Sequence, residues 1–284
     1  MLNMTSPSFD GGIDNHILRV LGCYQCFGVH ETTLQFLYTK VLCKKDNDFF
    51  LARYQTRATL PSDVDVRSLN DVELISSDSY CPPPPPGCTE AAHPPSNECF
   101  VKRPNLIGYT PDSQIQDNVL KEVSVCEILR KNPHRNIAEY HGCEIRNGRV
   151  TGLCFKRYLD DLQLKLNPES LNKLSFQNNQ RPPLADALRY LKGIKSGLDH
   201  LHSLGFSHND INPANIMLDH DDKPIIIDFD SCLRHGTPLA KTKRTYGWHG
   251  EKIQISQPCN DDEALAELWT WLTSVNPDEF QFMV

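Results

Sequence analysis

The feature that most constrains the fold of this chain is a polar loop followed by two short apolar runs. The loop reads His208-Asn209-Asp210-Ile211-Asn212-Pro213-Ala214-Asn215. Residues 216–218 and 225–227 are the apolar runs, and the polar turn between them predicts a β-hairpin. Asp228 directly follows the second run. The fold is therefore expected to bring this loop near an acid at the end of a hairpin.

These residue types suit the chemistry of phosphate transfer. The oxygens of Asp210, Asn215 and Asp228 are hard ligands of the kind that Mg²⁺ accepts beside phosphate oxygens. Phosphoryl transfer needs a metal that bridges the phosphates, a carboxylate that accepts or orients the proton of the acceptor hydroxyl, and a cation on the phosphates. The loop and the hairpin meet most of that requirement.

Length and composition narrow the class of protein. The chain has 284 residues, of which 39% are apolar and 23% charged, which fits one large or two small globular domains. Its net charge of −7 argues against a general nucleic-acid or polybasic membrane binder. No apolar run approaches the roughly 18 residues of a membrane span, and residues 1–14 lack the pattern of a secretory signal. We therefore expect no nucleic-acid partner, no membrane span, and a cytoplasmic or nuclear location.

The cysteines predict reduced thiols. Eleven Cys, an odd number, are scattered from Cys23 to Cys259, which does not resemble a disulfide framework. Cys23 and Cys26 form one CxxC without a second CxxC or a His pair at zinc-finger spacing. Ordinary thiols are therefore favoured over a metal site.

Composition divides the chain into three zones. Residues 1–60 carry no motif, although 33–43 and 49–54 are plausible helices or strands. Residues 61–97 are acidic and then proline-rich, which favours a linker or surface loop over an SH3-type ligand. Residues 98–284 hold the expected domain. Its predicted elements are strands at 98–102 and 149–158 and helices at 117–130, 183–204 and 263–273, the second of these helices with Leu184, Leu188, Leu191, Ile194, Leu198 and Leu201 along one face.

The loop and hairpin resemble those of the eukaryotic protein-kinase superfamily. The segment from His208 to Asn215 stands where the family has H-R-D-L-K-P-x-N, and Asp-Phe-Asp at 228–230 stands where it has D-F-G. Five residues separate Asp210 from Asn215 and thirteen separate Asn215 from Asp228, which are the family's spacings. Upstream, residues 100–102 resemble the strand with the phosphate-binding lysine, and 133–142 resemble the family's H-P-N-I segment and the glycine after it.

The resemblance implies a fold and a set of roles. The fold is α+β, a bilobal protein-kinase-like fold with a divergent small lobe at about 98–158 and a truncated, mainly helical large lobe at about 159–284. The cofactors are ATP and Mg²⁺, and residues 154–158 form the strand and hinge against which adenine stacks. By position, Asp210 accepts the substrate proton, Asn215 and Asp228 hold Mg²⁺, Lys102 binds the α/β-phosphates, and Glu122 holds Lys102. His208 braces the loop, and Asp261 fastens it from below.

Several positions depart from the family pattern. Asn209 replaces the arginine that contacts a phosphorylated activation loop, Asn212 replaces the catalytic-loop lysine, and Asp230 replaces a glycine. Gly87 is the only glycine near the position of the glycine-rich phosphate loop, and residues 245–248 stand in place of A-P-E. This combination resembles the divergent kinase-like proteins of fungi.

Three functions are compatible with these motifs. The first is a Ser/Thr-type protein kinase that transfers phosphate from ATP with Mg²⁺. The second is a catalytically impaired pseudokinase that binds a nucleotide or a protein, favoured by Asn212, Asp230 and the missing glycine loop. The third is a small-molecule phosphotransferase of the aminoglycoside or choline kinase type, favoured by the Ile-Asp-Phe-Asp ending of the hairpin. The protein substrate or partner is not specified by the sequence.

Overall fold

The computed structural model describes residues 16–30, 33–46, 48–57, 60–92, 97–106, 108–110, 113–173, 181–240, 242–274 and 276–282. The chain divides into two compact units, the first formed by Met1–Pro82 with Pro104–Asp117 and the second by Pro83–Arg103 with Asn118–Val284. The expectation about a signal at residues 1–14 lies outside the described residues. Among the helices of the described ranges, none combines the length and the apolar character that crossing a membrane requires.

The first unit is an antiparallel sheet. Its five strands lie in the order β4-β1-β2-β3-β5. Both segments predicted as helices or strands are strands. Buried residues alternate along 49–54, whereas Val41, Leu42 and Cys43 are consecutive buried residues in the other segment. The long first strand was not expected from the sequence, and most of its apolar side chains are exposed. The bounds are β1 Ile17–His30, β2 Thr33–Lys45, β3 Asp48–Tyr54, β4 Asp63–Asp65 and β5 Asn70–Ile75.

The prediction that residues 61–97 form a linker or surface loop is wrong for the first part of this segment. β4 and β5 lie within it, and they pair with β1 and β3 respectively. Val64 and Ile75 are buried while the acidic residues between and beside them face water. The acidic composition concealed this alternation, whereas the prolines at 82–86 do lie outside regular elements.

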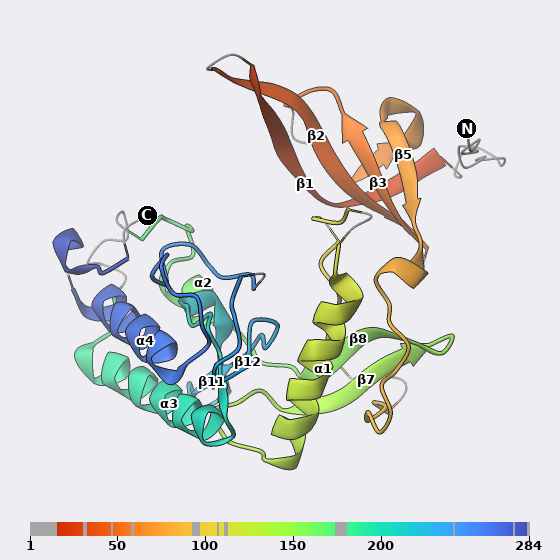
Figure 1. The fold of residues 1–284 in the computed structure, drawn as a ribbon. Helices are drawn as coiled ribbons and strands as arrows, with labels where there is room; N and C mark the ends of the chain where they lie inside the picture. The colour runs from red at the N-terminus through yellow and green to blue at the C-terminus, as the bar shows by residue number, and fades with distance from the viewer. Residues whose placement is uncertain are drawn as a thin grey trace. The chain divides into compact units, whose positions relative to one another are not determined.

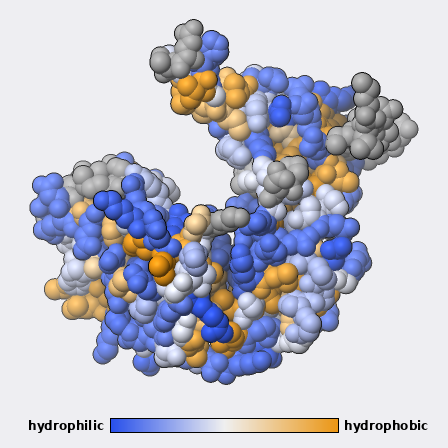
Figure 2. Space-filling model, viewed as in Figure 1, coloured by the Kyte–Doolittle hydropathy of each residue, from blue (hydrophilic) through white to orange (hydrophobic). Residues whose placement is uncertain are grey.

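The β1–β2 hairpin extends beyond the rest of its sheet. β4 pairs with β1 only at residues 17–19, and β3 pairs with β2 only from Thr39 onward. Val29 and Leu34, near the turn, are 74% and 70% exposed. Figure 2 shows the hydrophobic atoms gathered at this end of the hairpin. The tip therefore contributes little to the core of the first unit.

The second unit contains a small antiparallel sheet, with strands in the order β6-β8-β7, and helix α1 (Figure 1). The bounds are β6 Cys99–Lys102, β7 Tyr140–Arg146, β8 Arg149–Lys156 and α1 Ile115–Lys131. The predicted strands at 98–102 and 149–158 and the helix at 117–130 are confirmed. The expected stripe of α1 is buried, and Glu122 is buried with it at 5% exposure. Such a buried acid requires a partner.

The chain before β6 runs beside β7 instead of forming a glycine-rich loop. The N–H of Ala91 donates to the carbonyl of Cys143, and the N–H of Cys143 donates to the carbonyl of Thr89. Gly142 has φ +127°, and a Cβ there would lie 2.7 Å from the carbonyl oxygen of Thr89. Only glycine permits this approach of the two backbones.

The remainder of the second unit is mainly helical. Helices α3 and α4 pack side by side, and the predicted hairpin is present as β10 and β11 (Figure 1). The bounds are α2 Leu162–Leu166, α3 Leu184–Ser203, α4 Pro258–Thr273, β9 Phe206–Ser207, β10 Ile216–Leu218, β11 Pro224–Ile226 and β12 Leu233–Arg234. Short 3-10 helices lie at Pro213–Asn215 and Pro277–Glu279 in this unit, and at Val66–Ser68 and Ser77–Ser79 in the first unit.

Two helix predictions need correction. The first turns of α3 are not buried, since Leu184 and Leu188 are 60% and 52% exposed, while Leu198 and Leu201 are fully buried. Helix α4 begins at Pro258 rather than 263, because proline is favourable in a first helical turn. Trp271 is the fully buried tryptophan of α4, and Trp269 is partly exposed.

Candidate active site

Asp261 in the first turn of α4 fixes the polar loop. Its carboxylate accepts the backbone N–H of His208 at 2.8 Å and of Asn209 at 2.7 Å, and it pairs with the ring of His202 at 2.8 Å. The Asp261 side chain is fully buried. The expectation that Asp261 fastens the loop is confirmed, and His202 of α3 shares this carboxylate.

His208 braces the loop against the hairpin. Its Nδ1 lies 3.3 Å from the N–H of Asp210 and accepts that hydrogen, so Nε2 carries the ring proton. Nε2 donates to the carbonyl of Ile227 at 2.9 Å. Because both ring nitrogens are engaged within the protein, His208 is positioned as a structural residue rather than a reactive one.

The hairpin brings Asn215 and Asp228 to the same end. Asn215 directly precedes β10, Ile216 pairs with Ile226, and the N–H of Ile227 donates to the carbonyl of Asn215 at 3.0 Å. Asp228 follows with a left-handed φ of 64°. Asp is among the residue types that adopt this left-handed region most readily.

Asp228 and Glu122 both form ion pairs with Lys102. The Lys102 ammonium lies 2.6 Å from Glu122 Oε1 and 2.5 Å from Asp228 Oδ1. Glu122 Oε1 also accepts the N–H of Phe229 at 3.3 Å. Three separate elements, β6, α1 and the end of the hairpin, therefore converge on one cation.

Burial and charge act in opposite directions on these groups. Burial alone lowers the pKa of Lys102, but the attraction of Glu122 and Asp228 outweighs it and raises that pKa. Burial also disfavours the charged form of Asp228, yet the nearby Lys102 ammonium brings the pKa of Asp228 below its usual value. The lysine is therefore cationic and Asp228 anionic at neutral pH, which are the charge states that phosphate and metal binding require.

Three hydrogen bonds orient the carboxylate of Asp210. Its Oδ1 accepts the N–H of Thr245 at 2.7 Å, and its Oδ2 accepts the Thr245 hydroxyl at 3.0 Å and the Asn215 amide at 3.2 Å. Asn215 also donates to the Asp210 carbonyl at 2.9 Å. These donors hold the buried carboxylate of Asp210 in one rotamer.

Asn212 occupies the position of the catalytic-loop lysine without supplying a charge. Its amide donates to the carbonyl of Asp210 at 3.1 Å and to the hydroxyl of Thr245 at 3.0 Å. Its side-chain oxygen accepts the N–H of Ala214 at 3.0 Å and caps the short 3-10 helix. Asn212 therefore retains a positioning role for Asp210 and Thr245.

The oxygens of Asn215 and Asp228 fit a divalent cation. The amide nitrogen of Asn215 is used by Asp210, and within the described chain no donor is bonded to Asn215 Oδ1 or to Asp228 Oδ2. One neutral and one anionic oxygen that lack donors suit Mg²⁺, which keeps several waters and phosphate oxygens as its other ligands. These two residues would hold the ion.

A cavity of about 370 Å³ lies beside Lys102 and Asp228. Residues 155–158 at the end of β8 border it, as the resemblance implied for the hinge. Phe100 and Met217 also line it. These two residues were missed at the sequence level, although Phe100 lies two residues before Lys102 in a strand and must face the same side. The cavity is mostly apolar, which suits a planar base.

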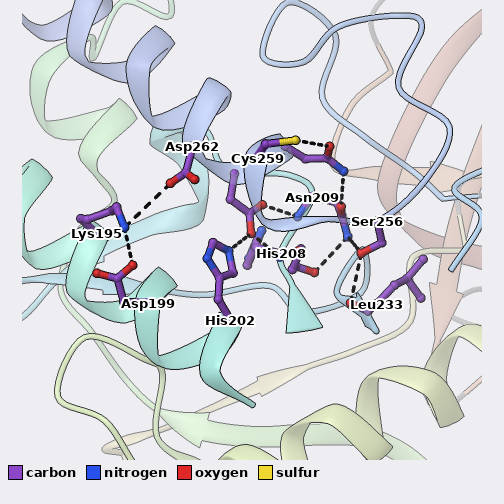
Figure 3. Close-up of polar contacts among 12 residues, drawn as sticks. Lys195, Asp199, His202, His208, Asn209, Leu233, Ser256, Cys259 and Asp262 are labelled. Carbon is purple, nitrogen blue, oxygen red and sulfur yellow. Dashed lines mark hydrogen bonds and ion pairs between the residues drawn. The ribbon is translucent and has the colours of Figure 1, made fainter. Parts of the chain in front are cut away.

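Asn209 ties the loop to the segments that follow the hairpin. Its amide nitrogen approaches the carbonyls of Ser207 and Ser231 at 2.9 and 3.1 Å and the Ser256 hydroxyl at 3.0 Å. Its side-chain oxygen accepts from Asn260 at 3.0 Å. Figure 3 shows Asn209 beside Ser256, whose hydroxyl continues to the carbonyl of Leu233. Asn209 therefore forms hydrogen bonds between uncharged groups at the position where the family has an arginine.

Asp230 does not adopt a conformation that requires glycine. Among the described residues with positive φ, Asp228 is included and Asp230 is not. In this structure the backbone of Asp230 therefore does not need the left-handed conformation that favours glycine. Burial and the nearby Asp228 carboxylate raise the pKa of Asp230. Its Oδ1 accepts the hydroxyl of Ser231 at 2.9 Å.

All five residues predicted for the site lie in the second unit. Lys102, Glu122 and Asp228 form one contact group, and Asp210 and Asn215 form another. The start and end of the β10–β11 hairpin connect the two groups. Thr245 was missed, because nothing local in the sequence signals a contact across 35 residues.

Comparisons with known proteins agree with this geometry. A model of the protein kinase domain matches residues 99–250. Yeast MAP kinase kinase kinase SSK2 is 28% identical over 159 residues, which cover 55% of this chain and 9% of that protein. Mitogen-activated protein kinase kinase kinase 20 of Arabidopsis thaliana is 31% identical over 120 residues, covering 36% of this chain and 35% of that protein.

A third relative, the serine/threonine-protein kinase Tao of Drosophila melanogaster, is 28% identical over 173 residues, covering 60% of this chain and 15% of that protein. The chain thus spans between 9% and 35% of the length of these relatives. Because the family model covers more than half of the chain, the chain belongs to the eukaryotic protein kinase superfamily, and its fold is an α+β kinase-like fold.

Proposed function

We propose that this protein transfers the terminal phosphate of ATP, bound with Mg²⁺, to a hydroxyl group of a serine or threonine in a protein. The observation that carries the proposal is the convergence of Lys102, Glu122 and Asp228 at the end of the hairpin that starts at Asn215. The Ser/Thr assignment follows the names of the relatives. Mg²⁺, when bound, neutralises phosphate charge and orients the phosphates.

Each residue of the site has a role in the proposed reaction. Lys102 places its positive charge on the phosphates, and Glu122 keeps the ammonium directed into the cleft. Asp210 orients the acceptor hydroxyl and accepts its proton, while Thr245 and Asn215 hold its carboxylate. Phe100, Phe155 and Met217 supply apolar surface for the base.

A second candidate is a binding protein that retains the nucleotide but transfers phosphate poorly. Asn212 favours it, because a neutral amide stands where a cation would stabilise charge that develops on the transferred phosphate. The same Asn212 keeps Asp210 and Thr245 positioned, which favours a slow enzyme over an inactive one.

A transfer assay separates the candidate functions. Full-length protein is incubated with Mg²⁺ and γ-labelled ATP, together with serine- and threonine-containing proteins in one arm and choline or an aminoglycoside in another. The proposal predicts label in protein only. Label in the small acceptors would select the small-molecule phosphotransferase, and nucleotide binding without transfer would select the binding protein.

Replacing Lys102 by Met is predicted to weaken ATP binding. A charge-assisted contact contributes roughly 1.5–3 kcal/mol, which corresponds to an increase in Kd of about 10- to 100-fold. Calorimetric titration with ATP and Mg²⁺ measures the change, with circular dichroism as a check of folding. Lys192→Met, at an exposed position of α3, is the matched control. Equal affinities of Lys102→Met and the unchanged protein would contradict the assigned role.

Activity is predicted not to depend on phosphorylation of the segment after the hairpin. Asn209 and Arg244 already connect this segment to the loop, since Arg244 Nε donates to the Asn209 carbonyl at 2.9 Å. Phosphatase treatment should therefore leave the transfer rate within about twofold, whereas Asn209→Ala should lower it and cost about 1–3 kcal/mol of stability through buried unpaired groups. A tenfold loss after phosphatase treatment would refute this prediction.

A further inference from the structure

A second cavity, of about 740 Å³, lies in the second unit and also borders the segment at the end of β8. It is lined by the end of α1, the segment that leads into β7, the end of β8 and the β10–β11 turn. Ala138, Lys156 and Tyr158 line both this cavity and the one beside Lys102. We call it the His134 cavity, after a residue on its wall.

The His134 cavity collects cations whose charges are not neutralised. Arg130, Arg135 and Lys156 line it, all three exposed. Within the described residues, none of the three forms an ion pair or a side-chain hydrogen bond. The chain as a whole carries a net charge of −7. The lining therefore has three cations against two carboxylates, Glu139 and Asp219, so its charge balance is positive in a chain that is acidic as a whole, which favours anions.

The two acids that line the same wall have partners within the protein. Glu139 pairs with the ring of His141 at 3.3 Å. Oδ1 of Asp219 accepts the N–H groups of Asp221 and Lys223, both at 2.9 Å, within the hairpin turn. Within the described residues, neither carboxylate forms an ion pair with Arg130, Arg135 or Lys156, so the guanidinium groups can still contact another anion.

Protein groups hold the ring of His134 at both of its nitrogens. Its Nδ1 accepts the N–H of Asn136 at 3.2 Å, so the neutral ring carries its proton on Nε2, which lies 3.4 Å from the Ser196 hydroxyl. The ring stacks on His200 with centroids 4.9 Å apart. Burial, His200 and Arg135 together lower the pKa of His134, which is consistent with a positive potential at this wall.

We propose that the His134 cavity binds a small anion that carries two or more phosphate groups. Two arginines favour phosphate, because each guanidinium presents paired donors that match phosphate oxygens. The volume exceeds what a single phosphate fills and lies in the range of small-ligand sites. Because Lys156 and Tyr158 also line the cavity beside Lys102, the anion would share these two residues with the nucleotide cavity.

The proposal is tested by calorimetric titration of the full chain with inorganic tripolyphosphate in the presence of EDTA. Each measurement is repeated on Lys102→Met, which disables the nucleotide site, so the result is independent of the proposed function. We expect one binding event that survives Lys102→Met and that weakens about tenfold or more in Arg135→Ser and in Arg130→Ser. Added NaCl should lower the affinity, because exposed charges are screened.

Lys192→Ser, an exposed cation of α3 away from the cavity, is the matched control and should bind as the unchanged protein does. Three results would overturn the proposal: no binding at millimolar tripolyphosphate, equal weakening by Lys192→Ser, or binding lost in Lys102→Met and retained in Arg135→Ser. A doubly phosphorylated peptide is titrated in parallel. Binding of that peptide without binding of tripolyphosphate would also overturn it, because the site would then read a peptide.

Discussion

Asp210→Asn is expected to reduce phosphate transfer by roughly 100- to 10,000-fold, the usual contribution of a positioned general base. The substitution keeps the size of the side chain but removes the oxygen that accepts the hydroxyl proton. Asp210 is only 8% exposed and lies within a set of hydrogen bonds from Thr245 and Asn215, so its amide replacement can remain in place. The rate is measured as label transferred from γ-labelled ATP in the presence of Mg²⁺.

The control for this experiment is Asp199→Asn. Asp199 is an acid of α3 whose side chain is 59% exposed and which pairs only with Lys195 among the described residues. Its replacement should leave the rate unchanged. ATP binding should also persist in Asp210→Asn, since Lys102 and Asp228 are intact. A variant at Asp210 that transfers phosphate at the original rate would remove this residue from the reaction.

Lys173→Met is expected to lower the free energy of unfolding by roughly 3–5 kcal/mol, as is typical when one member of a buried ion pair is removed. Lys173 pairs with Glu267 of α4, and the two side chains are 4% and 0% exposed. The ammonium also donates to the carbonyls of Gly247 at 2.7 Å and Phe282 at 3.0 Å. The variant leaves the Glu267 carboxylate buried without its cation. Denaturant unfolding measures the change.

The double variant Lys173→Met/Glu267→Leu is expected to recover part of the loss, because a buried apolar pair avoids the desolvation of two charges. Lys165→Met is the control. Lys165 pairs with Asp222 at the surface, where its side chain is 40% exposed, and surface pairs contribute about 1 kcal/mol or less. A loss below about 1 kcal/mol in Lys173→Met would show that this buried cluster does not hold the helical part together.

The parts of the site that the sequence predicted are those with local signals. The loop and hairpin are contiguous, so the spacing of Asp210, Asn215 and Asp228 carries most of their geometry. The apolar period of α1 placed Glu122 beside a buried stripe, and the family resemblance connected it to Lys102. The resemblance also indicated Asp261, whose partners include backbone groups of the loop.

What the sequence could not predict depends on contacts between distant segments. Thr245 binds Asp210 across 35 residues, and Lys173 binds Glu267 across 94. Neither residue stands in a local pattern that signals a partner. The exposure of Leu184 could not be predicted for the same reason. An apolar period specifies which face of a helix is buried, but it does not specify how far along the helix other segments cover that face.

The central claim is that Asn215, Asp228 and Lys102 form one site for a nucleotide with a divalent ion. Thermal unfolding of the full chain with ATP, with and without Mg²⁺, tests it most directly, since a ligand that binds the folded state raises the midpoint. The account predicts a rise that requires both ATP and Mg²⁺ and that disappears in Asp228→Ala. An unchanged midpoint, or an equal rise in Asp228→Ala, would contradict it.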